Sequence, residues 1–199
     1  MNGAFFSQLP GIGIHQKRKL FELRNEYTLV DQSGTTIGTA NQERQSILTF
    51  LARLGSDLDV TLPSTIVVRD AAQMPVLEVH KPWFTTTVSA RTPDGQMLGS
   101  VKWKVRLGKR RFALLGPQGE ELGEVHAQNW RARDFRVFDT TGSEVARVTK
   151  KWRGLFTEAF TDADSYAVEF NEGLSETLRA LAFTAAVAVD LVMKQKDSS

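Results

Sequence analysis

The sequence contains no cysteine among its 199 residues, and no hydrophobic run in it is long enough to cross a membrane unbroken. The missing cysteine excludes disulfides, thiolate metal sites and cysteine nucleophiles. The first sixteen residues have neither a basic segment nor an apolar stretch of the length that a secretory signal needs. We therefore expect a protein that is not secreted, and we place it in the cytoplasm.

The sequence also lacks the local motifs of known enzyme classes. His15, His80 and His126 are far apart, and no metal-ligand spacing, nucleophile elbow or phosphate loop occurs. The short GIG at Gly11–Gly13 is interpreted as part of a flexible lead-in. We expect a protein that is not an enzyme and that requires no cofactor.

The composition is typical of one well-packed domain. Hydrophobic residues make up 41% of the chain and charged residues 24%, with twelve Phe and four Trp. A domain of this size buries about 70% of the surface of its unfolded chain. Aromatic side chains contribute large buried areas, so the sequence predicts a substantial core.

A two-strand pattern recurs along the chain without gaps. In four copies, alternating apolar residues lead into a turn that contains glycine and then resume, which is typical of a β-hairpin. These copies begin at Tyr27, Val88, Phe112 and Phe135, and their turn glycines are Gly34, Gly95, Gly119 and Gly142. A fifth copy, from Val67, keeps the spacing but has Gln73 at the glycine position.

Successive hairpins predict an antiparallel sheet that closes on itself. Five hairpins give about ten strands, which is near the limit for a twisted open sheet. One strand from 19–25 and one from 166–170 bring the expected number to about twelve. The segment Glu43–Leu54 has apolar residues at helical spacing, so we expect a short amphipathic helix there.

The last apolar segment, Leu178–Met193, predicts a helix that is buried on nearly every side. Its uninterrupted apolar stretch, Ala180–Val189, has ten residues, whereas a spanning helix needs about 20. Its many alanines make it slender enough for a barrel lumen. We therefore expect a central helix inside the barrel, with Asp190 at the barrel mouth or beside a basic partner.

The segment VARVTKKWRGLFTEAFTDADSYAVEF, together with the apolar helix that follows, closely resembles the C-terminal part of phospholipid scramblases, which belong to the tubby-like, LURP-one-related superfamily. The opening Ile14–Gln16 and the first hairpin are also similar to that family. The resemblance implies a single tubby-like domain over 1–199: lead-in 1–18, barrel 19–170, central helix 171–194 and flexible tail 195–199. The proline-rich leader and palmitoylated cysteines of animal members are absent, so the chain looks like a minimal bacterial-type member.

The resemblance also implies a metal site. Family calcium binding is attributed to a segment that corresponds here to Asp162–Gly173, in which Asp162 and Asp164 could supply carboxylate oxygens. Calcium prefers six to eight oxygens, and the later alternate positions here are apolar. Two interpretations of this segment therefore remain open: a weak calcium site, and a turn that leads into the last strand without binding a metal.

A basic segment provides the candidate lipid-binding site. Between Asp94 and Glu120 the chain has no acidic residue but carries six cations, several of which alternate with apolar residues. The six are Lys102, Lys104, Arg106, Lys109, Arg110 and Arg111. Anionic lipid attracts such clusters by about 1 kcal/mol per basic residue, although a solvated barrel face has the same pattern.

These observations leave two main hypotheses. The first is a scramblase-like monomer that binds anionic phospholipid at the inner face of the membrane, with lipid movement between leaflets as the further role that the resemblance implies. The second is a soluble tubby-like scaffold without lipid-transport activity. Nucleic acid is disfavoured as a partner, because an aromatic such as Trp103 would point away from the cations of its own strand. Protein partners are not predicted.

Overall fold

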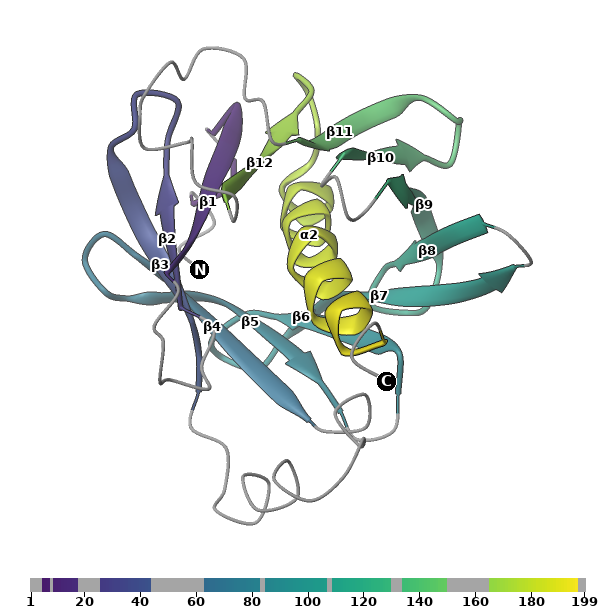
Figure 1. The fold of residues 1–199 in the computed structure, drawn as a ribbon, viewed down its shortest axis with the longest axis horizontal. Coiled ribbons are helices and arrows are strands. Elements are labelled where there is room, and N and C mark those ends of the chain that lie inside the picture. The colour runs from purple at the N-terminus through teal and green to yellow at the C-terminus, as the bar shows by residue number, and fades with distance from the viewer. Residues whose placement is uncertain are drawn as a thin grey trace.

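The computed structural model describes residues 5–7, 9–17, 26–43, 63–82, 85–106, 109–129, 134–149 and 165–196 (Figure 1). At 16–17, 105–106, 109–110, 128–129 and 189–196 only the course of the backbone is described.

Twelve strands form one closed antiparallel barrel, in which every strand pairs with its neighbours in the sequence. Pairing of the first strand with the last, from Gly11 opposite Glu169 to His15 opposite Ser165, closes the ring. The strands are β1 Gly11–Lys17, β2 Glu26–Val30, β3 Thr36–Gln42, β4 Ser64–Asp70, β5 Pro75–Lys81, β6 Thr87–Arg91, β7 Met97–Arg106, β8 Lys109–Leu115, β9 Glu121–Asn129, β10 Asp134–Asp139, β11 Glu144–Thr149 and β12 Ser165–Phe170. The structure confirms the barrel that the hairpin repeat predicts.

Five tight turns at one end of the barrel, here called the turn end, follow a common design. In each, the residue at the glycine position donates its backbone N–H to the carbonyl three residues earlier. Gly34, Gly95, Gly119 and Gly142 have φ between 82° and 88°, which confirms the predicted left-handed position. Gln73, the exception in the sequence pattern, also adopts a positive φ, of 63°.

The helix α2, Glu176–Lys196, begins at the turn end and runs through the ring of strands (Figure 1). Its 21 residues span about 31 Å at 1.5 Å per residue. The side chains from Ala180 to Ala188 are all at most 2% exposed, so this part of the helix is the centre of the core. The structure confirms the central helix. The helix was expected to begin at residue 171, but residues 171–175 form a turn and the helix begins at Glu176.

Arg179 joins the first turn of α2 to the wall of the barrel. Its guanidinium donates hydrogen bonds to the backbone carbonyls of Leu174, Leu9 and Asn171. It also lies over the ring of Phe170, with 5.3 Å between Cζ and the ring centroid. A residue that interrupts the apolar pattern thus satisfies carbonyl groups that the barrel end would otherwise leave unpaired.

The structure differs from the sequence analysis at the N-terminal edge of the barrel. The strand that precedes the first hairpin is β1, Gly11–Lys17, within the segment that was expected to be a flexible lead-in. Its Ile12 and Ile14 are fully buried, and this alternation with glycine is the strand signal that was missed. The strand expected at 19–25 and the helix expected at Glu43–Leu54 fall outside the described residues, apart from Glu43 itself.

Candidate functional site

The basic segment folds as the β7–β8 hairpin, and the strand register sorts its cations. The pairs Lys102–Ala113, Lys104–Arg111 and Arg106–Lys109 alternate with the pairs Trp103–Phe112 and Val105–Arg110. Directly opposed residues share a face of the sheet, and successive pairs alternate between faces. The register therefore places five of the six cations in one series and Arg110 in the other.

In the second series, the side chains that the structure describes, those of Trp103 and Phe112, face the core. Phe112 is fully buried, and Trp103 packs against the core with its ring stacked on that of Phe112, 6.4 Å between centroids. This is the orientation expected for Trp103 from strand alternation. The first series is on the outer wall, where Lys102 is exposed.

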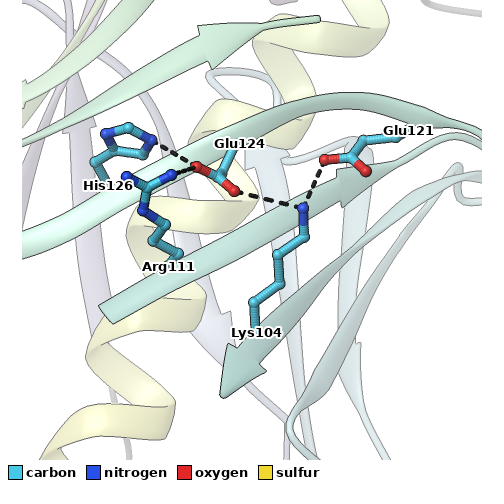
Figure 2. Close-up of polar contacts among 5 residues, drawn as sticks. All are labelled: Lys104, Arg111, Glu121, Glu124 and His126. Carbon is cyan, nitrogen blue, oxygen red and sulfur yellow. Dashed lines mark hydrogen bonds and ion pairs between the residues drawn. The ribbon is translucent and has the colours of Figure 1, made fainter. Parts of the chain in front are cut away.

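Two of the outer cations are engaged by acidic residues of the next strand, β9 (Figure 2). Lys104 Nζ lies 2.6 Å from Glu121 Oε1 and 3.4 Å from Glu124 Oε2. Arg111 donates to Glu124 Oε1, which is also 2.6 Å from His126 Nε2. Glu124, whose side chain is 17% exposed, is thus the centre of a polar network that also contains Lys104, Arg111 and His126.

Within this network, the acidic and basic side chains stabilise each other's charged forms. Partial burial acts to raise the pKa of Glu124, but the hydrogen bond with His126 and the charge of Arg111 outweigh it, so the pKa lies below the ordinary 4.5. The hydrogen bond to Glu121 raises the pKa of Lys104 above 10.5. At neutral pH the Glu124 carboxylate is therefore ionised and Lys104 is charged.

The six cations are therefore not equivalent. Glu121 and Glu124 compensate Lys104 and Arg111, whereas Lys102 is exposed on the same wall. For Arg106, Lys109 and Arg110 the structure describes the backbone alone. Sequence reasoning missed the two acids because they follow the acid-free stretch in the chain, and only the pairing of β8 with β9 brings them beside it.

The three histidines lie on separate strands with separate partners. His15 Nδ1 is 2.9 Å from the Ser165 hydroxyl, and His80 Nδ1 is 2.9 Å from the Thr65 hydroxyl, while His126 contacts Glu124. Within the described parts of the chain, no three His, Asp or Glu residues are grouped so as to hold a metal ion. The histidines therefore form no common site.

The sequence profile of the Scramblase family matches residues 7–195 of the chain. The chain belongs to the scramblase family. Human phospholipid scramblase 2 is 33% identical over 96% of this chain and 70% of its own length, and human phospholipid scramblase 1 is 21% identical over 98% and 66%. Altered inheritance rate of mitochondria protein 25 from Saccharomyces cerevisiae is 24% identical over 76% of this chain. The chain thus spans 53 to 70% of the lengths of these three relatives.

The fold is found outside these relatives as well. The X-ray structure of a protein from Arabidopsis thaliana superposes with a TM-score of 0.55 at 13% identity, covering 92% of this chain and 93% of that one. This likeness supports the tubby-like architecture of the scramblase-family chain, a closed barrel around one C-terminal helix.

The calcium-binding segment that the scramblase resemblance implied, Asp162–Gly173, is described from Ser165 onward. Asp162 and Asp164 lie outside the described residues. Three later alternate positions of the segment, Tyr166, Val168 and Phe170, belong to β12 and are buried in the core. Their side chains are part of the barrel wall and supply no ligands at these positions. Calcium binding by Asp162 and Asp164 stays a prediction from the resemblance.

The hydrophobic helix of this scramblase-family chain is a core element. Among the described residues, no helix combines the length and apolar character needed to cross a bilayer. The backbone at Asp190 continues α2, and the structure does not describe its side chain, so a place at the barrel mouth or beside a basic partner stays a prediction.

Proposed function

We propose that this chain attaches peripherally and reversibly to anionic phospholipid membranes through its basic β7–β8 hairpin. The observation that carries the proposal is the register, which assigns Lys102, Lys104, Arg106, Lys109 and Arg111 to one series of the hairpin, and Lys102 in this series is exposed. Membership of the scramblase family supports a membrane role. Each basic residue near an anionic surface contributes about 1 kcal/mol, so a few suffice for reversible attachment.

Attachment through the hairpin leaves the core intact. Lys102, Lys104 and Arg111 are on the outer wall, and the helix from Ala180 to Ala188 is buried behind the strands. Binding of this kind requires no helix insertion and is weakened by salt. We further propose that the protein binds at the inner face of the membrane and as a monomer. Promotion of lipid movement between leaflets is the further activity that we propose on the family relationship.

A soluble scaffold without lipid activity is the alternative, and one observation favours it. Glu121 and Glu124 already compensate Lys104 and Arg111, which lowers the attraction of the wall for anionic headgroups. The alternative predicts no association with vesicles of any composition.

Cosedimentation with vesicles distinguishes the two functions. The purified protein is mixed with neutral and with anionic vesicles across a salt series, with and without calcium. We expect pelleting with anionic vesicles alone and release at high salt, because charges beyond a Debye length of about 8 Å are screened at physiological ionic strength. An equal response to both vesicle types, or no pelleting at all, contradicts the proposal, and a calcium requirement would support the site at Asp162 and Asp164.

A further inference from the structure

A cavity of about 420 Å³ opens at the turn end of the barrel, and none of the six cations of the basic segment lines it. It lies between the first turn of α2, the β4–β5 and β6–β7 turns and the aromatic pair Phe5–Phe6. Its volume is within the range of about 300–1,000 Å³ that is typical of small-molecule sites. The vesicle-binding proposal makes no use of it.

The cavity has an apolar floor. Seven of its eleven lining residues are apolar. Phe6 and Ala180 are buried, and Phe5, Val76 and Leu98 pack partly buried against the core. The ring of Phe6 is fixed from behind by Phe183, with 5.6 Å between their centroids. An alkyl chain placed here would lose contact with water and gain contacts with an already ordered wall.

The mouth of the cavity has the opposite character. Asp94 and Glu176 line it and are exposed, with the half-buried hydroxyls of Thr92 and Thr177 beside them. The lining contains no lysine or arginine within the described residues. The start of a helix carries about half a positive charge, which two full carboxylates outweigh. The pKa of Asp94 is lowered mainly by its hydrogen bond with Thr92, and the positive charge of the N-terminus contributes to this. Two carboxylates against this charge and that of the helix start leave the mouth with a small net negative charge.

Apolar surface continues beyond the cavity. Met74 and Met97 are the exposed large hydrophobic residues of the described chain, at 54% and 37%. They directly precede the lining residues Pro75 and Leu98. A chain longer than the cavity could therefore extend along the same end of the barrel.

We propose that this cavity binds a single-chain amphiphile with a cationic amine head, its alkyl chain on the floor of Phe6, Leu98 and Ala180 and its ammonium between Asp94 and Glu176. The gradient from buried apolar floor to exposed acidic mouth selects this class. A fatty acid would place its carboxylate beside two others, and a soluble polyamine would leave the floor empty.

Titration calorimetry at neutral pH with octylamine tests the proposal, with octanoate, 1-octanol and spermidine as comparisons. We expect one saturable octylamine site, at least about tenfold weaker binding of octanoate, and no binding of spermidine. If octanoate binds as tightly as octylamine, the carboxylates do not contribute to selectivity. If spermidine binds as tightly as octylamine, the apolar floor does not contribute to binding. Either result, or no octylamine binding, overturns the proposal.

Matched variants locate the site. Asp94→Asn with Glu176→Gln changes two exposed side chains, and we expect octylamine affinity to fall at least about tenfold while octanol binding is unchanged. Glu43→Gln with Glu78→Gln makes the same charge change elsewhere and serves as the control. Leu98→Trp fills the cavity and should abolish both alkyl ligands. Equal losses in the mouth and control variants overturn the assignment, whereas vesicle pelleting should be unchanged in the mouth variant.

Discussion

At the scale of single residues, the β4–β5 turn contains one residue in a strained backbone conformation. Gln73 has φ of 63°, where the equivalent turns have glycine. A left-handed conformation costs a residue with a Cβ about 1–2 kcal/mol in the folded protein. Glycine avoids this cost, but part of the gain is offset because glycine gives the unfolded chain more conformational entropy. We expect Gln73→Gly to raise the free energy of unfolding by about 0.5–1 kcal/mol, measured by urea denaturation.

The reciprocal substitution is the control for that prediction. Gly119 has φ of 87°, and a Cβ added there would meet no atom within 4 Å, so only the backbone conformation is tested. Gly119→Gln should lower the free energy of unfolding by about 1 kcal/mol. If both substitutions shift stability in the same direction, backbone conformation does not explain the turn pattern.

Glu124 predicts a pH dependence whose sign follows from its lowered pKa. A carboxyl group with a pKa lower in the folded than in the unfolded protein contributes stability above its unfolded pKa, and this is lost as the pH falls through the folded pKa. Glu124→Gln should therefore be less stable than the unmodified protein at pH 7. The difference should begin to shrink as the pH falls towards 4.5, the ordinary pKa at which the unfolded chain takes up the proton, and it should be lost once the pH passes the lower pKa of the folded protein. Urea unfolding at pH 7, 5, 4 and 3 measures it, and a difference that is independent of pH contradicts the assignment.

At the scale of elements, α2 depends on Arg179 for its attachment at the turn end. Three backbone carbonyls accept hydrogen bonds from its guanidinium. Arg179→Met keeps the apolar stem but leaves those carbonyls unpaired, and we expect a loss of about 2–4 kcal/mol in the free energy of unfolding. Arg179→Lys keeps the charge without the three-way geometry and should fall in between. Stability of Arg179→Met equal to that of the unmodified protein would show that water replaces these bonds.

The hairpin and β9 together set the charge available to a membrane. Glu124→Gln removes the carboxylate that holds Arg111 and contacts Lys104. We expect affinity for anionic vesicles to rise about fivefold, the equivalent of one basic residue near the surface. Glu144→Gln on β11 releases Arg136 on β10, makes the same change in net charge and is the control. Equal effects of the two variants would mean that net charge alone governs binding.

At the scale of the whole molecule, the architecture could be predicted because it is repeated in the sequence. The alternation of apolar residues and the turn glycine recur in each copy of the hairpin. The apolar, alanine-rich segment near the end of the sequence must be buried as a helix, and a closed barrel can surround it. The first strand was missed because Gly11 and Gly13 occupy alternate positions of β1, which made it look like a loop. Local pattern is informative where each element repeats a design, and weak where glycine replaces the side chains that carry the pattern.

The candidate site was predictable only in part, for a physical reason. Alternation on a strand predicted that Lys102 and Lys104 share a face, but the contacts of Lys104 and Arg111 depend on side chains from a third strand. The bulges in the β8–β9 and β9–β10 pairings shift which residues oppose each other. Nothing in the sequence specifies those shifts, so Glu124 could not be assigned to the network in advance.

We propose that the β7–β8 hairpin, and not overall charge, holds the protein on anionic membranes. The formal net charge is only +2, so a general attraction is weak and the position of the cations must decide the outcome. Two triple variants separate these effects, because each lowers the net charge to −1. One changes Lys102, Arg106 and Lys109 to serine, and the other changes Arg69, Arg91 and Arg136 to serine.

Cosedimentation of both variants with anionic vesicles at one fixed salt concentration is the most direct measurement. We predict that the hairpin variant loses roughly a hundredfold in affinity, about 1 kcal/mol for each cation, while the control variant stays near the unmodified protein. Equal losses in the two variants, or full retention of binding by the hairpin variant, would contradict the account.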